Sequence, residues 1–151
     1  MGTPLDKVLH PYDQKRVVTT IGLAERMSCG EIAVHVEGRV PGGNPVKRGQ
    51  DLIQKLGITR TRERNAVLIY AAVRDRRFAI IADQGVGEPP ESKAWEEAMA
   101  RMTIAFRGGR FGDGICEAVK SVGKALAKKF PRQSDDTNEV SNEITTDETA
   151  L

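Results

Sequence analysis

The alternation of apolar and polar positions along the chain predicts a mixed α/β domain. Three segments have the alternation or the unbroken apolar run of strands, namely 31–37, 66–73 and 77–83. Four segments repeat apolar side chains at helical spacing, namely 10–28, 46–58, 91–106 and 112–130. The order strand, helix, strand, hairpin strand implies one right-handed crossover and one antiparallel partner. We therefore expect a three-layer α/β/α sandwich in which helices flank a small mixed β-sheet.

The hairpin predicted over residues 66–83 ends on an acid that two glycines follow. Asp83 closes a strand, the position at which open α/β sheets usually bind ligands. Its carboxylate suits a divalent cation or loop amides, and Gly85 and Gly87 allow the backbone to approach closely. The alternative is an aspartate that accepts a hydrogen bond within its own turn, which is common.

Other acids are candidates to join Asp83. Glu25 and Glu31 flank the break between the first helix and the first strand, and Asp113 lies at the start of the last helix. Asp113 is explained equally well as a helix cap. No two of these acids stand at a spacing that is diagnostic of a metal site. His35, in the first strand, fits a partly buried structural histidine better than a catalyst.

Charge is distributed unevenly along the 151 residues. The formal net charge is +2, but residues 131–151 contain six acids and one basic residue, so residues 1–130 carry +7. The acidic stretch has too few apolar side chains to offset the entropy of ordering it. We therefore expect residues 1–131 to form one domain and residues 132–151 to be a disordered acidic tail.

Several kinds of function find no support in the composition. Cys29 and Cys116 lack the spacing of a metal site or a disulfide scaffold, and no serine lies in a nucleophile elbow. The arginines of 60–64 and 74–77 are not interleaved with aromatic residues, so we expect no nucleic-acid binding. No segment has the roughly 20 apolar residues of a membrane span, and residues 1–16 lack the apolar core of a signal peptide. We expect a cytoplasmic monomer.

Three motifs in a fixed order carry a family resemblance. They are AERMSCGEIAVHVE, LGITRTRERNAVLIYAAVRDRRFAIIADQGV and FRGGRFGDGICEAVKSVGKALAKKFP, with Trp95 between the second and the third. Together they resemble the TPM domain family, which includes thylakoid proteins and bacterial YgcG-like proteins, over residues 10–131. The resemblance implies an α/β/α sandwich, divalent-metal binding, an acid-phosphatase activity and a role in maintaining membrane complexes such as photosystem II.

The family pattern is matched at Glu25, Glu31, Asn65, Asp83, Gly85 and the FRGGRFGDG loop. Asn65 precedes the first strand of the hairpin and Asp83 follows the second, so both lie on the same side of the sheet. The resemblance thus implies one polar site in which Asp83, aided by Glu31 and Asp113, holds Ca²⁺ or Mg²⁺. The chain departs from the pattern at Ala66, where relatives have glycine.

Two functions remain open at this point. The first, which we favour, is a non-catalytic module that binds a protein partner or another ligand and contains a divalent-metal cleft. It is favoured because the sequence offers no recognisable nucleophile or general base. The second is a weak metal-dependent phosphomonoesterase, similar to an acid phosphatase, in which Asn65 or a nearby arginine orients the phosphate.

Overall fold

Proline and cap residues set the starts of the first two long helices. The computed structural model describes residues 2–87, 92–132 and 142–150, and its α-helices there are α1 (Pro11–Glu25), α2 (Pro45–Lys55), α3 (Ser92–Arg107) and α4 (Phe111–Lys129). Three short 3-10 turns accompany them: η1 (Pro4–Lys7), η2 (Ile58–Arg60) and η3 (Glu148–Ala150). A proline opens α1 and α2, where its missing N–H costs nothing. The Asn44 side chain caps α2 by accepting from the Lys47 N–H at 3.1 Å.

The sheet of the described residues has three strands in the order β1-β2-β3. β1 (Glu31–Glu37) runs parallel to β2 (Ala66–Ala72), and β2 pairs antiparallel with β3 (Arg77–Ala82). The central position of β2 agrees with its apolar pattern, because every residue of this strand is buried. β1 and β3 are the edge strands.

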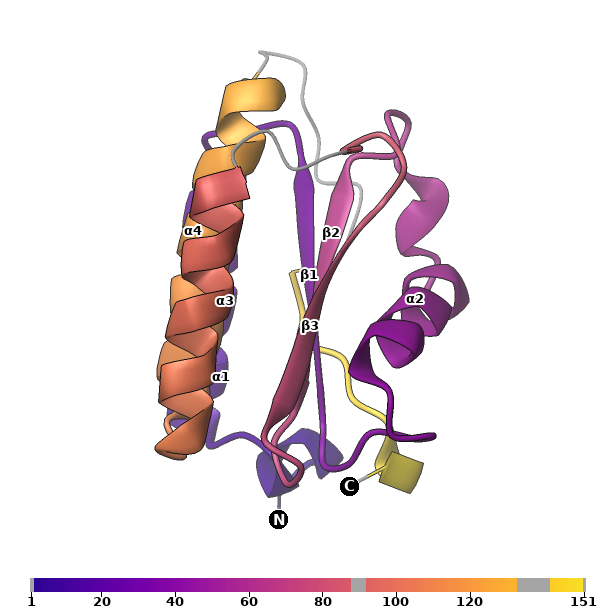
Figure 1. Ribbon diagram of the computed structural model, residues 1–151, viewed down its shortest axis with the longest axis vertical. Coiled ribbons are helices and arrows are strands. Elements are labelled where there is room, and N and C mark those ends of the chain that lie inside the picture. Colours follow the sequence, from indigo (N-terminus) through magenta and orange to yellow (C-terminus); the bar gives the residue numbers. More distant parts are fainter. Residues whose placement is uncertain (1, 88–91, 133–141, 151) are drawn as a thin grey trace.

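Helices cover both faces of this sheet, which confirms the predicted α/β/α sandwich. α1, α3 and α4 lie on one face and α2 lies on the other (Figure 1). On the first face Val34 and Ile69 share a buried cluster with Val119, and on the second Leu68 packs in a cluster with Leu52. The parallel strands β1 and β2 are therefore buried on both sides, whereas β3 is mostly half-buried.

Part of the predicted tail lies against β1. Over residues 142–150 the backbone runs along this edge strand, shown in yellow beside β1 in Figure 1. The Val36 N–H donates to the Thr145 carbonyl at 2.9 Å, and the Thr145 N–H donates to the Val34 carbonyl at 3.0 Å. We call residues 142–150 the docked segment.

The expectation of disorder does not hold for the docked segment. Backbone hydrogen bonds to an edge strand need no apolar side-chain pattern, so the polar composition was a poor guide here. Residues 133–141 and 151 of the predicted tail lie outside the described residues.

Candidate functional site

Four residues predicted to form a site gather at one end of the sheet. β1 and β2 begin there and β3 ends there, so strand pairing brings together the neighbourhoods of Glu31, Asn65 and Asp83. Glu25, the last residue of α1, joins them by contact with β1. None of the four is more than 8% exposed. We call these four residues the polar end. Asn65 and Asp83 both lie at this end of the sheet, as the hairpin pattern predicted.

The polar end is not the end at which parallel strands usually bind ligands. Asp83 follows β3, but β3 is antiparallel to β2, so its carboxyl end lies beside the amino ends of β1 and β2. The rule for open α/β sheets refers to the carboxyl ends of parallel strands and does not apply to Asp83. The chemistry of the polar end must therefore be judged from its side chains.

Glu25 and Glu31 form a buried pair of carboxyl groups. Their side chains are hydrogen-bonded to each other, and Glu25 Oε2 also accepts from the Ile32 N–H at 3.0 Å. Burial and, next, the hydrogen bond to Glu31 raise the pKa of Glu25 to about 8. At neutral pH the pair therefore holds a proton. Apart from the partner carboxyl, no hydrogen-bond donor reaches Glu25 Oε1.

Asn65 adds a buried amide oxygen to the polar end. Its Nδ2 donates to the Cys29 carbonyl at 3.1 Å and to Glu63 Oε2 at 3.3 Å. Because both partners are acceptors, the nitrogen must face them and Oδ1 must face the other way. Asn65 Oδ1 is buried and accepts no hydrogen bond. A buried acceptor in this state is costly unless something binds it.

Asp83 is bound by an arginine rather than exposed to a ligand. Arg64 donates to it through Nε at 2.7 Å and through Nη2 at 2.8 Å. The Gln84 N–H donates to Asp83 Oδ1 at 2.8 Å, which is the turn hydrogen bond that the sequence left as an alternative. The Arg64 backbone has a left-handed conformation with φ 52°, which is unfavourable for a residue with a side chain, and backbone hydrogen bonds with Thr61 and Gly85 fix it on both sides.

The two glycines after Asp83 have the roles that a tight loop requires. A Cβ at Gly85 would lie 1.9 Å from the Glu63 carbonyl oxygen, so only glycine allows the two loops to touch. Gly87 has φ 62°, which glycine adopts without strain. Gly85 thus lets the loop after Asp83 pack directly against the loop before Asn65.

Asp113 does not reach the polar end. It lies in the first turn of α4, where its Oδ1 accepts from Arg16 Nη2 at 2.8 Å, and its side chain is 51% exposed. Arg16 precedes Glu25 by nine residues of α1, which corresponds to about 13 Å of helical rise. The expectation that Asp113 aids Asp83 and Glu31 therefore does not hold, because α1 and α4 run alongside each other and Asp113 meets the opposite end of α1.

A second buried polar cluster, of which the sequence indicated only His35, lies at the other end of β1. The Glu37 carboxylate accepts from Tyr70 at 2.6 Å and lies 2.7 Å from His35 Nε2. Arg48 of α2 donates to it through Nε at 3.0 Å and Nη2 at 2.9 Å. Burial alone would raise the pKa of Glu37, but the hydrogen bonds from these partners lower it below its usual value. The available signal was the spacing of His35 and Glu37, which puts both on one face of the strand.

The docked segment completes this second cluster. Thr145 Oγ1 lies 2.8 Å from His35 Nδ1, and Asp147 Oδ2 accepts from Arg48 Nη2 at 3.0 Å. Hydrogen bonds from Thr149 and, more weakly, from Arg48 lower the pKa of Asp147 to about 2. Asp147 is therefore ionised at neutral pH and forms a charged contact with α2.

Two features of the described residues bear on function. No group of three or more His, Cys, Asp or Glu side chains there is arranged to hold a metal ion. At the polar end the carboxyl groups of Glu25 and Glu31 and the amide oxygen of Asn65 remain as oxygen donors, because Arg64 binds the third carboxyl group, that of Asp83. No helix of the described ranges is long and apolar enough to cross a bilayer.

Comparison with known proteins gives a consistent family. The model of the TPM domain matches residues 4–125. The BA42 protein of the psychrophilic bacterium Bizionia argentinensis, solved by NMR, shares 32% identity, with a TM-score of 0.83 over 92% of this chain and 95% of that one. The N-terminal domain of a P. gingivalis protein has 20% identity and a TM-score of 0.66, over 83% of this chain and 82% of that one. The N-terminal domain of a Corynebacterium glutamicum protein has 14% identity and a TM-score of 0.64, over 88% of this chain and 82% of that one. The search of curated proteins found no match.

Proposed function

The chain belongs to the TPM domain family, and from this premise we propose that it is a non-catalytic binding module whose polar end takes up a divalent cation. One observation carries the proposal. Two buried carboxyl groups, Glu25 and Glu31, are hydrogen-bonded to each other at the end of the sheet where Asn65 Oδ1 accepts no hydrogen bond. Oxygens of these kinds are the ligands that a divalent cation prefers, and the positive charge of Arg132 already acts on Glu25.

The donor set fits Ca²⁺ or Mg²⁺. Both ions prefer carboxylate and amide oxygens, and the three side chains supply them from two strand starts and one helix end. A divalent cation there replaces the proton that Glu25 and Glu31 hold and also satisfies Asn65 Oδ1. The cation site is centred on Glu31 rather than on Asp83, because Arg64 already neutralises Asp83.

Calorimetric titration of the full chain with CaCl₂ and MgCl₂ at pH 8 tests this assignment. We expect saturable binding by the wild type and its loss in Glu31→Gln, which keeps the size of the side chain but removes its charge. Asp113→Asn is the matched control, because it removes one exposed carboxylate far from the polar end. Absence of binding by the wild type, or an equal loss in the control, contradicts the proposal.

The phosphomonoesterase alternative is tested on the same variants with a generic aryl phosphate. We favour binding because Arg64, one of the arginines beside the polar end, is held by both oxygens of Asp83. We expect no turnover above that of a protein-free control, with or without Mg²⁺. Metal-dependent turnover that Glu31→Gln abolishes would replace our proposal with the alternative. The cytoplasmic location, the monomeric state and the role in membrane-complex maintenance stay predictions.

A further inference from the structure

The outer side of β1 is an edge that a peptide backbone occupies. Besides the two hydrogen bonds that join Thr145 to Val34 and Val36, the Gly38 and Arg39 N–H groups both donate to the Ala150 carbonyl, at 2.7 and 2.8 Å. An edge strand with outward N–H and C=O groups is a general template for binding an extended segment. In this chain the docked segment uses that template.

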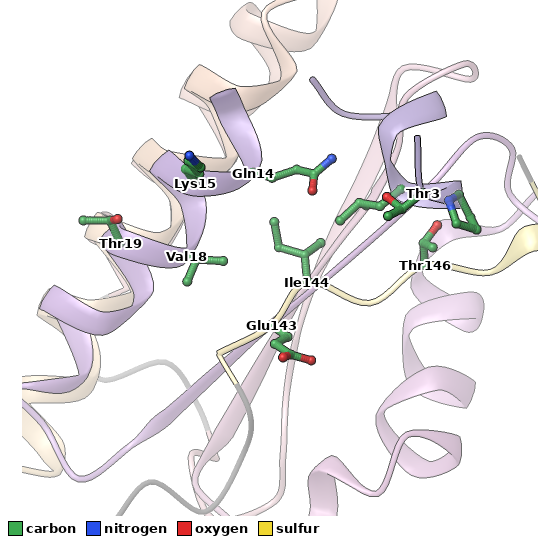
Figure 2. A pocket seen from close by; sticks show the side chains of 10 residues that line it. Thr3, Gln14, Lys15, Val18, Thr19, Glu143, Ile144 and Thr146 are labelled. Atoms are coloured by element: carbon green, nitrogen blue, oxygen red, sulfur yellow. The ribbon is translucent and has the colours of Figure 1, made fainter. Parts of the chain in front are cut away.

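Three side chains of the docked segment contact the domain. Thr145 meets His35 through its hydroxyl, and Asp147 meets Arg48 through its carboxylate. Ile144 packs against the main apolar cluster and lines a pocket of about 750 Å³ between the docked segment, η1 and α1. Figure 2 shows Ile144 in this pocket together with Gln14 and Val18 of α1. The docked segment therefore places an apolar residue, a threonine and an acid at fixed spacing against the domain.

The docked segment contributes little to the folded core. Within it only Ala150 is buried, and the residues before it are half-buried or exposed. The two apolar clusters consist of residues of the domain, with Ile144 only packed against their margin. Displacing the docked segment thus exposes hydrogen-bonding groups and Arg48 rather than the core.

We propose that the β1 edge and Arg48 form a recognition site for an extended acidic segment of a partner protein, and that the docked segment is its intramolecular occupant. The partner segment carries an apolar residue, a threonine and an acid, spaced as Ile144, Thr145 and Asp147 are. Charge complementarity favours this partner, since residues 1–130 carry a net +7 and Arg48 faces the acid. A partner binds by displacing residues 142–150.

Fluorescence anisotropy with a labelled peptide of residues 142–150 tests the site on the full chain. In Thr145→Pro the proline cannot donate to the Val34 carbonyl and lacks the hydroxyl that meets His35. This variant should bind the peptide at least about tenfold more tightly than the wild type, whose tethered segment competes. Thr145→Val, which keeps the backbone N–H, is the matched control and should bind with intermediate affinity.

A variant of the peptide provides a second test of the site. A peptide with asparagine in place of the acid of Asp147 should bind Thr145→Pro about tenfold more weakly, because it loses the charged contact with Arg48. In NMR spectra the amide signals of Val36, Gly38 and Arg39 should shift as the wild-type peptide is added.

Four results would overturn the proposal. The first is no peptide binding by Thr145→Pro up to about 1 mM, and the second is equal affinity for the acid and asparagine peptides. The third is loss of the cooperative unfolding transition in Thr145→Pro, which would make the docked segment an integral strand of the fold. The fourth is a wild-type complex of two chains by light scattering, which would assign the edge to segment exchange between copies.

Discussion

Replacing Glu25 by glutamine should remove a pH dependence from the stability of this protein. The folded chain raises the pKa of Glu25 from 4.5 to about 8, chiefly by burial. Between these values the native state holds a proton that the unfolded chain has released, so the free energy of unfolding falls as the pH rises. The slope for one proton is at most about 1.4 kcal/mol per pH unit. Below pH 4.5 and above pH 8 this contribution to the slope vanishes.

Urea unfolding followed by circular dichroism at pH 5.5 and 7.5 measures the effect. Over these two pH units the free energy of unfolding of the wild type should fall by about 2–3 kcal/mol more than that of Glu25→Gln, whose amide does not titrate. Taking the difference between the two proteins cancels the titrating groups that do not interact with Glu25, so the difference reports the Glu25–Glu31 pair. Glu117→Gln, at an exposed position on α4, is the control and should follow the wild type. Parallel curves for the wild type and Glu25→Gln would refute the shared-proton description of the pair.

Two further predictions concern the packing that supports the two polar clusters. Gly85→Ala should lower the free energy of unfolding by about 2–3 kcal/mol in urea, because its Cβ would lie 1.9 Å from the Glu63 carbonyl oxygen. Gly22→Ala, in the open middle of α1, should be neutral or stabilising, and equal effects at the two glycines would contradict the close-approach argument. Tyr70→Phe should cost about 2 kcal/mol by thermal or urea unfolding, since it removes the 2.6 Å hydrogen bond to the buried Glu37 carboxylate. A loss below about 0.5 kcal/mol would mean that Glu37 does not depend on this donor.

The sequence predicts the sheet well where local rules decide the pairing. The tight turn between two apolar runs fixes the β2–β3 hairpin, and the hairpin alone places Asn65 and Asp83 on one side. The apolar run of β2 likewise predicts a central strand. These inferences need no knowledge of how the helices pack.

The sequence fails where the outcome depends on distant elements. The apolar stripe of α4 does not say in which direction this helix runs against α1, so Asp113 was expected near Asp83 but meets Arg16. The sequence also does not identify Arg64 as the partner of Asp83, because Arg64 is only one of several arginines in a basic loop. The polar composition of the docked segment suggested disorder, although the β-branched run from Ile144 to Thr146 was a signal for an extended strand.

The most direct test of the cation site is amide chemical-shift mapping of the full chain during separate titrations with Ca²⁺, Mg²⁺ and phosphate. Our account predicts saturable shifts with a divalent cation that are centred on Glu31, Ile32 and Asn65 and are absent in Glu31→Gln. Shifts centred on residues 110–114, or no saturable shift with either cation, would contradict it.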